Sequence, residues 1–470
     1  MAWQIVGVVV FRRGSEAPMR IKFPSDLSAL LSAGLLRSVA SLGIKVATAG
    51  LTYLTYVVLS RTMTPDEYGH FAFGLALATV LAIAAGTGQP MAILRLWSQE
   101  AVAGRREEAI RAVQAGSSIT IAASFCLSAL LCIFTFVVWQ VYPPSDTPNH
   151  FYGAAFLILP MAMAEYNSSV LRAQGSLWTA LVPRDLLWRM ALPALVLGLF
   201  AFGLVLSGPE ALVLSAALLS LMLAGQFWLS EKRHYVLMPA LGQMRSYWRK
   251  WGGLSRWLML GALIETAALN ADVILVGLML DLESSGVYFN AFRTAGLMTL
   301  FTFAIELVIA PMVAQHFHAG EMRKAQAITA LASVAGFAFS LVIFALFVGW
   351  GDFVLSLFGD YYAEGTMVLV LLAFGLLFDA ATGPSKIVMM MTGHERAYVV
   401  IFGTIMALGF VVQFLVIPAY GIVGAAAANM GARIIAQIAI ALWCRFRIGL
   451  DTSLLGIFAL RSAIDRPGRA

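Results

Sequence analysis

The sequence has few charged residues and few cysteines, and both shortages limit what the protein can be. Asp, Glu, Lys and Arg make up 12% of the 470 residues, whereas 60% are hydrophobic. A soluble globular domain carries about 25% charged residues. Cys126, Cys132 and Cys444 all lie inside or at the end of apolar runs, so we expect neither a disulfide framework nor a metal-binding cluster. The composition indicates a membrane protein with several spans.

Alternation of apolar and polar residues is also missing from the long apolar stretches, which excludes strands as the spanning elements. The stretches are long enough to cross a bilayer as helices. We therefore expect an all-α integral membrane protein with about twelve transmembrane helices. The predicted spans are 35–59, 68–94, 112–141, 151–172, 180–206, 210–230, 254–280, 286–313, 325–350, 363–385, 397–418 and 422–446.

The lysines and arginines predict the orientation of these spans, because cytoplasmic loops are enriched in both residues. If the N-terminus is cytoplasmic, every second connection faces the cytoplasm, and these connections carry nearly all the basic residues. Arg61 alone is assigned to an outer connection, and we single out Lys45, Arg293 and Arg433 as bases within the membrane. Both termini are therefore expected in the cytoplasm.

An internal repeat divides the chain into two halves. Similar segments recur at an offset of about 217 residues, and self-similarity at a fixed offset indicates a repeated architecture. The aligned glycines are Gly69 with Gly286, Gly104 with Gly320, and Gly175 with Gly393. Each half holds six predicted spans, an even number, so the two copies share one orientation. We expect two six-helix bundles related by a pseudo-two-fold axis along the membrane normal, as in transporters that rock two bundles around a central site.

The domain boundaries follow from these signals. We expect a cytoplasmic N-terminal segment, a six-helix bundle, a basic linker, a second six-helix bundle and a cytoplasmic tail, at residues 1–34, 35–230, 231–253, 254–446 and 447–470. The linker, which contains tryptophan, either grips anionic lipid headgroups or is an ordinary cytoplasmic connection. The apolar residues near Met1 are followed by basic ones, which argues against a secretory signal. Either these residues form an interfacial segment, or translation begins at Met19 and they are not part of the protein.

The first loop carries a family resemblance. "LSRTMTPDEYGHFAFGLAL" (59–77), "GTGQPMAILRLWSQ" (86–99) and the charged "GRREEAIRA" loop resemble the opening of Wzx-type polysaccharide and O-antigen flippases, which share a superfamily with MATE exporters. The family pattern has an acidic residue where this chain reads "AGTGQP". The resemblance implies two six-helix bundles in the bacterial inner membrane and export of a polyprenyl-diphosphate-linked glycan. A polysaccharide polymerase is then a candidate partner.

Lys45 lies in the middle of the first predicted span, about 15 Å from its cytoplasmic end. A lysine at the bilayer centre costs roughly 2.5–3.5 kcal/mol, so it needs water or a partner. Ser41, Thr48 and Thr52 share its helix face. One interpretation is a cavity wall whose cation attracts the diphosphate of a carrier lipid. The other is an ion pair with a carboxylate on another helix, with the hydroxyls bonding back to their own helix.

Two arginines extend the same hypothesis. Arg433 shares a helix face with Asn429 and Gln437, and Arg293 begins about two turns below the outer surface. A guanidinium group can donate two hydrogen bonds to one phosphate. We therefore predict a diphosphate cavity with three bases and a polar lining: Lys45, Arg293 and Arg433, with Ser41, Thr48, Thr52, Asn429 and Gln437. Ion pairs between helices remain the alternative.

Carboxylates within the spans are candidates for ion coupling, because ionisable residues at membrane depth often mark proton or cation pathways. They are Glu165, Glu265, Asp272 and Asp379, with Glu306 nearby in the eighth span. The resemblance to MATE-like proteins implies that a carboxylate on the seventh helix and another on the tenth bind Na⁺ or H⁺. Asp272 and Asp379 could fill these positions, and Glu265 competes with Asp272. Alternatively, the acids neutralise the buried bases.

The sequence thus favours a flippase for a lipid-linked oligosaccharide, coupled to an ion gradient. A MATE-type multidrug exporter is the first alternative, although the intramembrane bases argue against it. A membrane glycan ligase or polymerase is the second, and the short outer loops leave little room for its catalytic site. We find no nucleotide-binding loop, metal-ligand spacing or catalytic triad. We therefore expect a protein that is not an enzyme, without a cofactor, a metal or a nucleic-acid partner.

Overall fold

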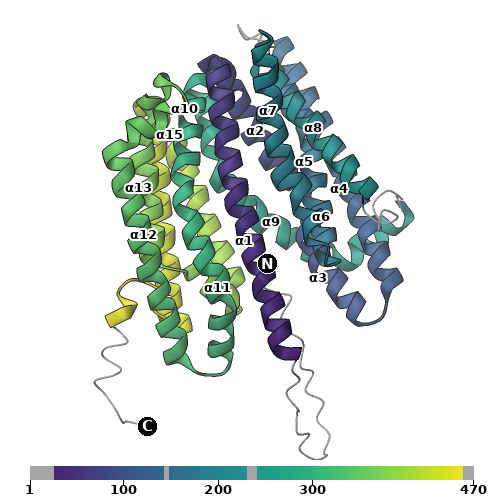
Figure 1. The fold of residues 1–470 in the computed structure, drawn as a ribbon, viewed down its shortest axis with the longest axis vertical. Coiled ribbons are helices and arrows are strands. Elements are labelled where there is room, and N and C mark those ends of the chain that lie inside the picture. The colour runs from purple at the N-terminus through teal and green to yellow at the C-terminus, as the bar shows by residue number, and fades with distance from the viewer. Residues whose placement is uncertain (1–25, 142–147, 230–240, 459–470) are drawn as a thin grey trace, which may run out of the picture.

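The computed structural model describes residues 26–141, 148–229 and 241–458, and the side chains of the first helix from Gly43 onward. These residues form helices and short connections, with no strand among the ranges just given. Figure 1 shows two groups of long helices side by side, with the first helix running between them in this view. The expected all-α membrane protein is confirmed.

The first group, which we call the N-half, spans residues 26–229. Its elements are α1 (Asp26–Thr62), α2 (Pro65–Ala85), α3 (Gln89–Val102), α4 (Arg106–Val141), α5 (Asn149–Ala173), α6 (Leu177–Leu181), the π-helical turn η1 (Val182–Leu187), α7 (Trp188–Ala201) and α8 (Gly208–Leu229). Following the predicted orientation, we call the end at which α1 begins the inner end and the opposite end the outer end.

The second group, the C-half, spans residues 241–458. Its elements are α9 (Leu241–Met279), α10 (Leu282–Ala295), η3 (Gly296–Met298), α11 (Thr299–His318), α12 (Met322–Ser356), η4 (Asp360–Gly365), α13 (Thr366–Thr382), α14 (Ser385–Met391), α15 (Glu395–Trp443) and η5 (Cys444–Ile448). In the described ranges, 10 helices are long and apolar enough to cross a membrane. Gly421 divides α15 into two, and 177–201, interrupted by η1, occupies the predicted fifth span.

Glycine and proline explain where the long apolar stretches break. Between α2 and α3 the chain turns at Thr87 and Gly88, with φ of 46° and 75°. Within α15, Gly421 has φ 58° and ψ −147°, which no helix accommodates. Gly383 separates α13 from α14 with φ 69°. Positive φ is routine for glycine and uncommon for other residues such as Thr87, so the three glycines allow the segments to end at these places.

The two halves share local geometry at the positions that the repeat aligns. Gly104 and Gly320 have φ of 73° and 75°, and Gly175 and Gly393 have φ of 86° and 82°. The N-caps also correspond. Thr64 accepts a hydrogen bond from Glu67 N at the start of α2, and Asp281 accepts one from Ser284 N at the start of α10. The repeat read from the sequence therefore appears as a structural repeat.

The halves meet closely at the outer end, where two repeat-related glycines touch. A Cβ on Gly69 would lie 2.0 Å from the carbonyl oxygen of Leu282. The preceding residue, Tyr68, donates a 2.5 Å hydrogen bond from its Oη to Asn290 Oδ1. These residues lie in a core that both halves share, with Tyr68 and Tyr362 ring centroids 5.5 Å apart. These contacts hold the two halves together at the outer end.

A second connection between the halves comes from Arg61, the last basic residue of α1. Its Nε and Nη2 donate hydrogen bonds of 2.7 Å to the carbonyl oxygens of Leu357 and Ser356, at the end of α12. The last carbonyls of a helix lack partners within it and carry partial negative charge. Arg61 of the N-half therefore caps a helix of the C-half.

Helix α9 connects the halves at the inner end. It begins at Leu241, inside the predicted linker, because the Trp-rich residues before Gly253 continue the helix. Tyr247 Oη donates a 2.8 Å hydrogen bond to Gln89 Oε1, and Gln89 Nε2 donates to Ser255 Oγ at 3.3 Å. The remainder of the predicted linker, 231–240, and most of the N-terminal segment lie outside the described residues.

The start of the predicted tail packs against the C-half. Gln326 on α12 donates to Asp451 O at 2.7 Å and accepts from Asp451 N at 2.8 Å. Thr452 is fully buried, and its carbonyl accepts a 2.6 Å hydrogen bond from Ser333. Residues 449–458 are therefore part of the folded unit.

Candidate functional site

Lys45 is held on α1 with its side chain 40% exposed. Its Nζ lies 3.8 Å from Oδ2 of Asp185. Thr48 and Thr52 each donate a 2.6 Å hydrogen bond back to their own helix, to the carbonyls of Ile44 and Thr48. Both features of the ion-pair interpretation are therefore present. Among the described residues, the ammonium group nonetheless has this single ion pair, and the distance is long. Ser41 lies on the same helix, but its side chain is outside the described set.

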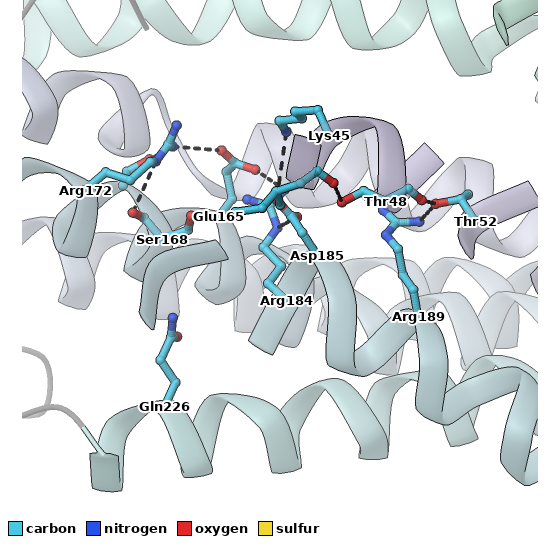
Figure 2. Close-up of polar contacts among 12 residues, drawn as sticks. Lys45, Thr48, Thr52, Glu165, Ser168, Arg172, Arg184, Asp185, Arg189 and Gln226 are labelled. Atoms are coloured by element: carbon cyan, nitrogen blue, oxygen red, sulfur yellow. Dashed lines mark hydrogen bonds and ion pairs between the residues drawn. The ribbon is translucent and has the colours of Figure 1, made fainter. Parts of the chain in front are cut away.

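Asp185 comes from η1, the π-helical turn that directly follows α6 and has Pro183 as its second residue. π-helical turns are rare and occur often at functional sites. Arg184 forms an ion pair with Glu165 of α5, and its Nε lies 3.7 Å from Asp185 Oδ1. Figure 2 shows Lys45, Arg184 and Asp185 converging from α1 and η1. The Asp185 carboxylate is therefore shared between two bases.

Glu165 is also shared between two bases. Arg172, two turns further along α5, places Nη2 3.8 Å from Glu165 Oε1. The same nitrogen donates a 2.8 Å hydrogen bond to Ser169 Oγ, and Nε donates to Ser168 O at 3.2 Å. The guanidinium is held mainly by uncharged oxygens.

Arg189 on α7 completes the arrangement. It donates a hydrogen bond from Nη1 to Thr52 Oγ1, and its Cζ lies 5.3 Å from the Trp188 ring. Its buried Nε has no hydrogen-bond partner in the described part of the chain. No carboxylate within ion-pair distance of Arg189 is found among these residues. Its charge is therefore not neutralised locally.

Together these side chains form what we call the basic cluster: Lys45, Glu165, Arg172, Arg184, Asp185 and Arg189 (Figure 2). Four bases against two carboxylates leave two positive charges unbalanced. Unpaired charge at membrane depth requires water or a counter-ion, because desolvating it is costly. The cluster can therefore bind an anion with several donors at once.

Arg433 has a different environment, in the C-half. Its Nη1 lies 2.8 Å from Oδ2 of Asp379, and both side chains are largely buried, at 11% and 24% exposure. Gln437 lies next to the same carboxylate. Asp379 Oδ1 has no hydrogen-bond partner among the described residues. This geometry matches the alternative in which acids neutralise the buried bases.

Asp272 is the most enclosed carboxylate of the predicted set, at 1% exposure. Gln413 donates to its Oδ1 at 2.9 Å. Asn429 and Tyr288 donate to its Oδ2 at 2.5 Å and 2.8 Å. None of the salt bridges in the described ranges involves it, so its direct partners are uncharged hydrogen-bond donors.

The remaining predicted residues are paired separately. Glu265 Oε1 lies 2.7 Å from Nζ of Lys386 on α14. Arg293 donates a 2.8 Å hydrogen bond to Asn270 Oδ1 and lies over the Phe289 ring at 4.8 Å. Lys45, Arg293 and Arg433 are therefore each held by different residues, and the structure does not join them into one hydrogen-bonded site.

Sequence reasoning missed Arg172, Arg184, Asp185 and Arg189. The first three lie next to a predicted loop, in a region where basic residues are expected anyway. The available signal was the stretch "VPRDLLWR" (182–189), in which three charges follow a proline inside a predicted span. That proline leads into a π-helical turn instead of ending the span.

Comparison with known proteins fits this architecture. The family model described as "Polysaccharide biosynthesis protein" matches residues 35–317, more than half of the chain. No curated protein sequence matches it significantly.

Solved structures of transporters share the fold. An inward-facing multidrug resistance MATE family transporter of the MOP superfamily has a TM-score of 0.69 at 15% identity, covering 88% of this chain and 96% of its own. The eukaryotic MATE transporter AtDTX14 has a TM-score of 0.59 at 16% identity, covering 92% and 100%. A MOP superfamily transporter from Pyrococcus furiosus, with a binding pocket described as reversed in polarity, has a TM-score of 0.57 at 16% identity, covering 92% and 96%.

The fold of two helical groups, the many apolar helices and the family match agree. The chain is a multi-pass membrane protein with the MATE-like transporter fold, and it belongs to the polysaccharide biosynthesis protein family, the family of Wzx-type flippases.

Proposed function

We propose that the protein is a flippase that moves a polyprenyl-diphosphate-linked oligosaccharide to the outer leaflet of the bacterial inner membrane by alternating access. The observation that carries this proposal is the basic cluster, with two positive charges in excess within the transmembrane part of the N-half. Membership of the polysaccharide biosynthesis family supports a glycan as cargo. Both termini would then be cytoplasmic, and a polysaccharide polymerase would receive the product.

A diphosphate suits the cluster chemically. It offers several anionic oxygens, and guanidinium groups recognise phosphate through two parallel hydrogen bonds. The Lys45 ammonium group would approach the diphosphate as a compact charge. It can leave Asp185 easily, because the distance between Nζ and Oδ2 is long, at 3.8 Å. Arg189 would contribute its unused Nε–H. Arg184, fixed by Glu165, would hold the Asp185 carboxylate when Lys45 turns to the ligand.

The coupling ion, Na⁺ or H⁺, is assigned to Asp272 and Asp379. Asp272 is held by neutral donors, so a proton or cation can bind there once these donors rearrange. Asp379 has an unused buried oxygen beside Arg433. Glu165 and Glu265 are engaged by Arg184 and Lys386, which makes them second choices for this role.

A multidrug exporter coupled to cations is the second candidate, favoured by the surplus of carboxylates in the C-half and by the fold. Glu265 pairs with Lys386 and Asp379 pairs with Arg433, whereas Asp272 and Glu306 have no ion-pair partner among the described residues. A cationic drug would bind such a surface, but the basic cluster opposite would repel it. A glycan ligase or polymerase is disfavoured because the described outer connections, such as 63–64 and 280–281, are short.

Ligand-dependent thermal stability of the purified protein tests the proposal. Wild type, Lys45→Ala and Arg189→Gln are titrated with a short-chain polyprenyl diphosphate and, separately, with a cationic dye. A ligand at 100 times its dissociation constant stabilises the folded state by about 2.7 kcal/mol, a readily measured shift. We expect the diphosphate to stabilise wild type, and each variant to lose most of that shift.

Lys324→Ala is the matched control, because Lys324 is 63% exposed at the inner end and belongs to no intramembrane cluster. It should keep the wild-type shift. Stabilisation by the dye alone would favour the exporter. If both variants melted early without any change in ligand dependence, the basic cluster would be structural and the flippase proposal would fail.

A further inference from the structure

Helix α9 extends beyond the membrane at its inner end. Its 39 residues give a length of about 58 Å, whereas the hydrocarbon core is about 30 Å thick. Since α9 reaches the outer end at Met279, its first turns lie at the level of the inner headgroups. The helix face there carries three arginines and a tryptophan, which we call the basic stripe: Arg245, Trp248, Arg249 and Arg256.

The opposite face of the same turns is fixed to the N-half. Tyr247 is 8% exposed and bonded to Gln89, which also bonds to Ser255. Trp251 and Leu258 pack against a hydrophobic cluster formed by α3, α4 and α5. The helix therefore cannot rotate to bury the basic stripe, and it presents the stripe away from these helices.

The arginines of the stripe have free charge. Arg245, Arg249 and Arg256 are exposed, and no carboxylate pairs with any of them in the part of the chain described. Their neighbour Lys250 is different, since its Nζ lies 3.9 Å from Glu108 and 5.1 Å from the Trp251 ring. Trp248 is 38% exposed in the middle of the stripe.

We propose that the basic stripe binds the headgroups of anionic phospholipids in the inner leaflet. Guanidinium forks match phosphate oxygens, and indole rings prefer the headgroup layer. Basic residues close to the surface gain from its negative potential, and an amphipathic helix with aromatic residues strengthens such binding. The complementary occupant is a surface of negative headgroups, which three guanidinium groups without a carboxylate partner among the described residues can contact from one helix face.

Thermal stability of the purified full chain in detergent, titrated with phosphatidylglycerol or phosphatidylcholine, tests the stripe. We expect wild type to be stabilised by phosphatidylglycerol and not by phosphatidylcholine. Removal of each arginine should weaken the response about fivefold. Arg245→Gln with Arg249→Gln should therefore raise the half-saturating fraction of phosphatidylglycerol about 25-fold and leave the stability in phosphatidylcholine unchanged.

Arg323→Gln with Arg396→Gln is the matched control, because both arginines are exposed near the inner end of the C-half and unpaired among the described residues. It removes the same charge without touching the stripe and should keep the wild-type response. Lys45→Ala should keep it too, which separates headgroup binding from binding at the basic cluster. Equal losses in both double variants, or equal stabilisation by phosphatidylcholine, would overturn the proposal.

Discussion

The two halves share a repeat but differ in how they treat buried charge. In the N-half, two carboxylates are spread over four bases, and Arg189 is left without an acid. In the C-half, Arg433 has its own carboxylate at 2.8 Å and Glu265 has its own lysine at 2.7 Å. One fold thus supports an N-half whose cluster has excess positive charge and a C-half in which Arg433 and Glu265 each have a partner of opposite charge. The two halves therefore share a backbone arrangement and differ in how their side chains pair buried charges.

The largest expected effect comes from removing Arg184, whose guanidinium group lies next to both carboxylates of the basic cluster. Arg184→Ala leaves Glu165 with only the distant Arg172, so we expect the melting temperature to fall by the equivalent of about 3–5 kcal/mol. Thermal unfolding in detergent measures this loss. Adding Glu165→Gln should restore much of it, because the stranded carboxylate is then neutral. No recovery in the double variant would show that Arg184 acts through packing instead.

The second expected effect distinguishes the halves by function. Replacing both members of the C-half pair, Arg433→Met with Asp379→Leu, should cost little stability, since apolar pairs often substitute well for buried ion pairs. We expect the variant to keep diphosphate binding and to lose its response to an ion gradient in proteoliposomes. Loss of diphosphate binding would mean that the C-half also contributes to binding the anion.

A third prediction uses the glycines that touch at the outer end. Gly69→Ala would place a Cβ 2.0 Å from Leu282 O, and the resulting shift should cost about 1–3 kcal/mol. Its repeat partner Gly286 has 3.3 Å to the nearest atom, so Gly286→Ala should be milder. Gly50→Ala, with nothing within 4 Å, serves as a control in thermal unfolding. Equal effects at Gly69 and Gly286 would contradict the asymmetry.

The smallest expected effect tests whether two repeat-related glycines respond equally to substitution where no neighbouring atoms contact them. Gly104 and Gly320 have φ of 73° and 75°. No atom lies within 4 Å of a Cβ at either position. Alanine at each should cost about 1 kcal/mol from backbone strain alone. The two changes in melting temperature should agree, and a clear difference between them would show that the loops of the two halves are not equivalent.

Much of the fold could be predicted from the sequence, because hydrophobic length and loop charge are local signals. The repeated glycines appear in the structure, and the described residues form 10 helices long and apolar enough to span, with α15 divided at Gly421 and 177–201 interrupted by η1. The start of α9 was placed too late because Trp and Tyr continue a helix into the headgroup layer, where hydropathy falls. Helix ends in amphipathic segments are set by partners that the sequence does not display.

The site was predicted less completely. Lys45 was identified because it interrupts an apolar run, but its partner Asp185 lies 140 residues away and enters through a π-helical turn. Arg433 and Asp379 were both predicted, with different roles, and only their distance shows them as a pair. Residue type and helix face indicate which side chains need partners. Which partner each one finds depends on how helices from distant parts of the chain pack.

In the proposed alternating-access cycle, the contact between Arg61 and the end of α12 would stabilise the state in which the outer end is closed. When the halves separate at the outer end, Arg61 must leave the carbonyls of Ser356 and Leu357, and the end of α12 loses its cap. These carbonyls then face water or lipid headgroups until the gate closes again, so the open interval is disfavoured by the two lost hydrogen bonds. In such a cycle, the equilibrium between closed and open outer ends would depend on a single guanidinium group, and the closed arrangement is the one that the structure shows.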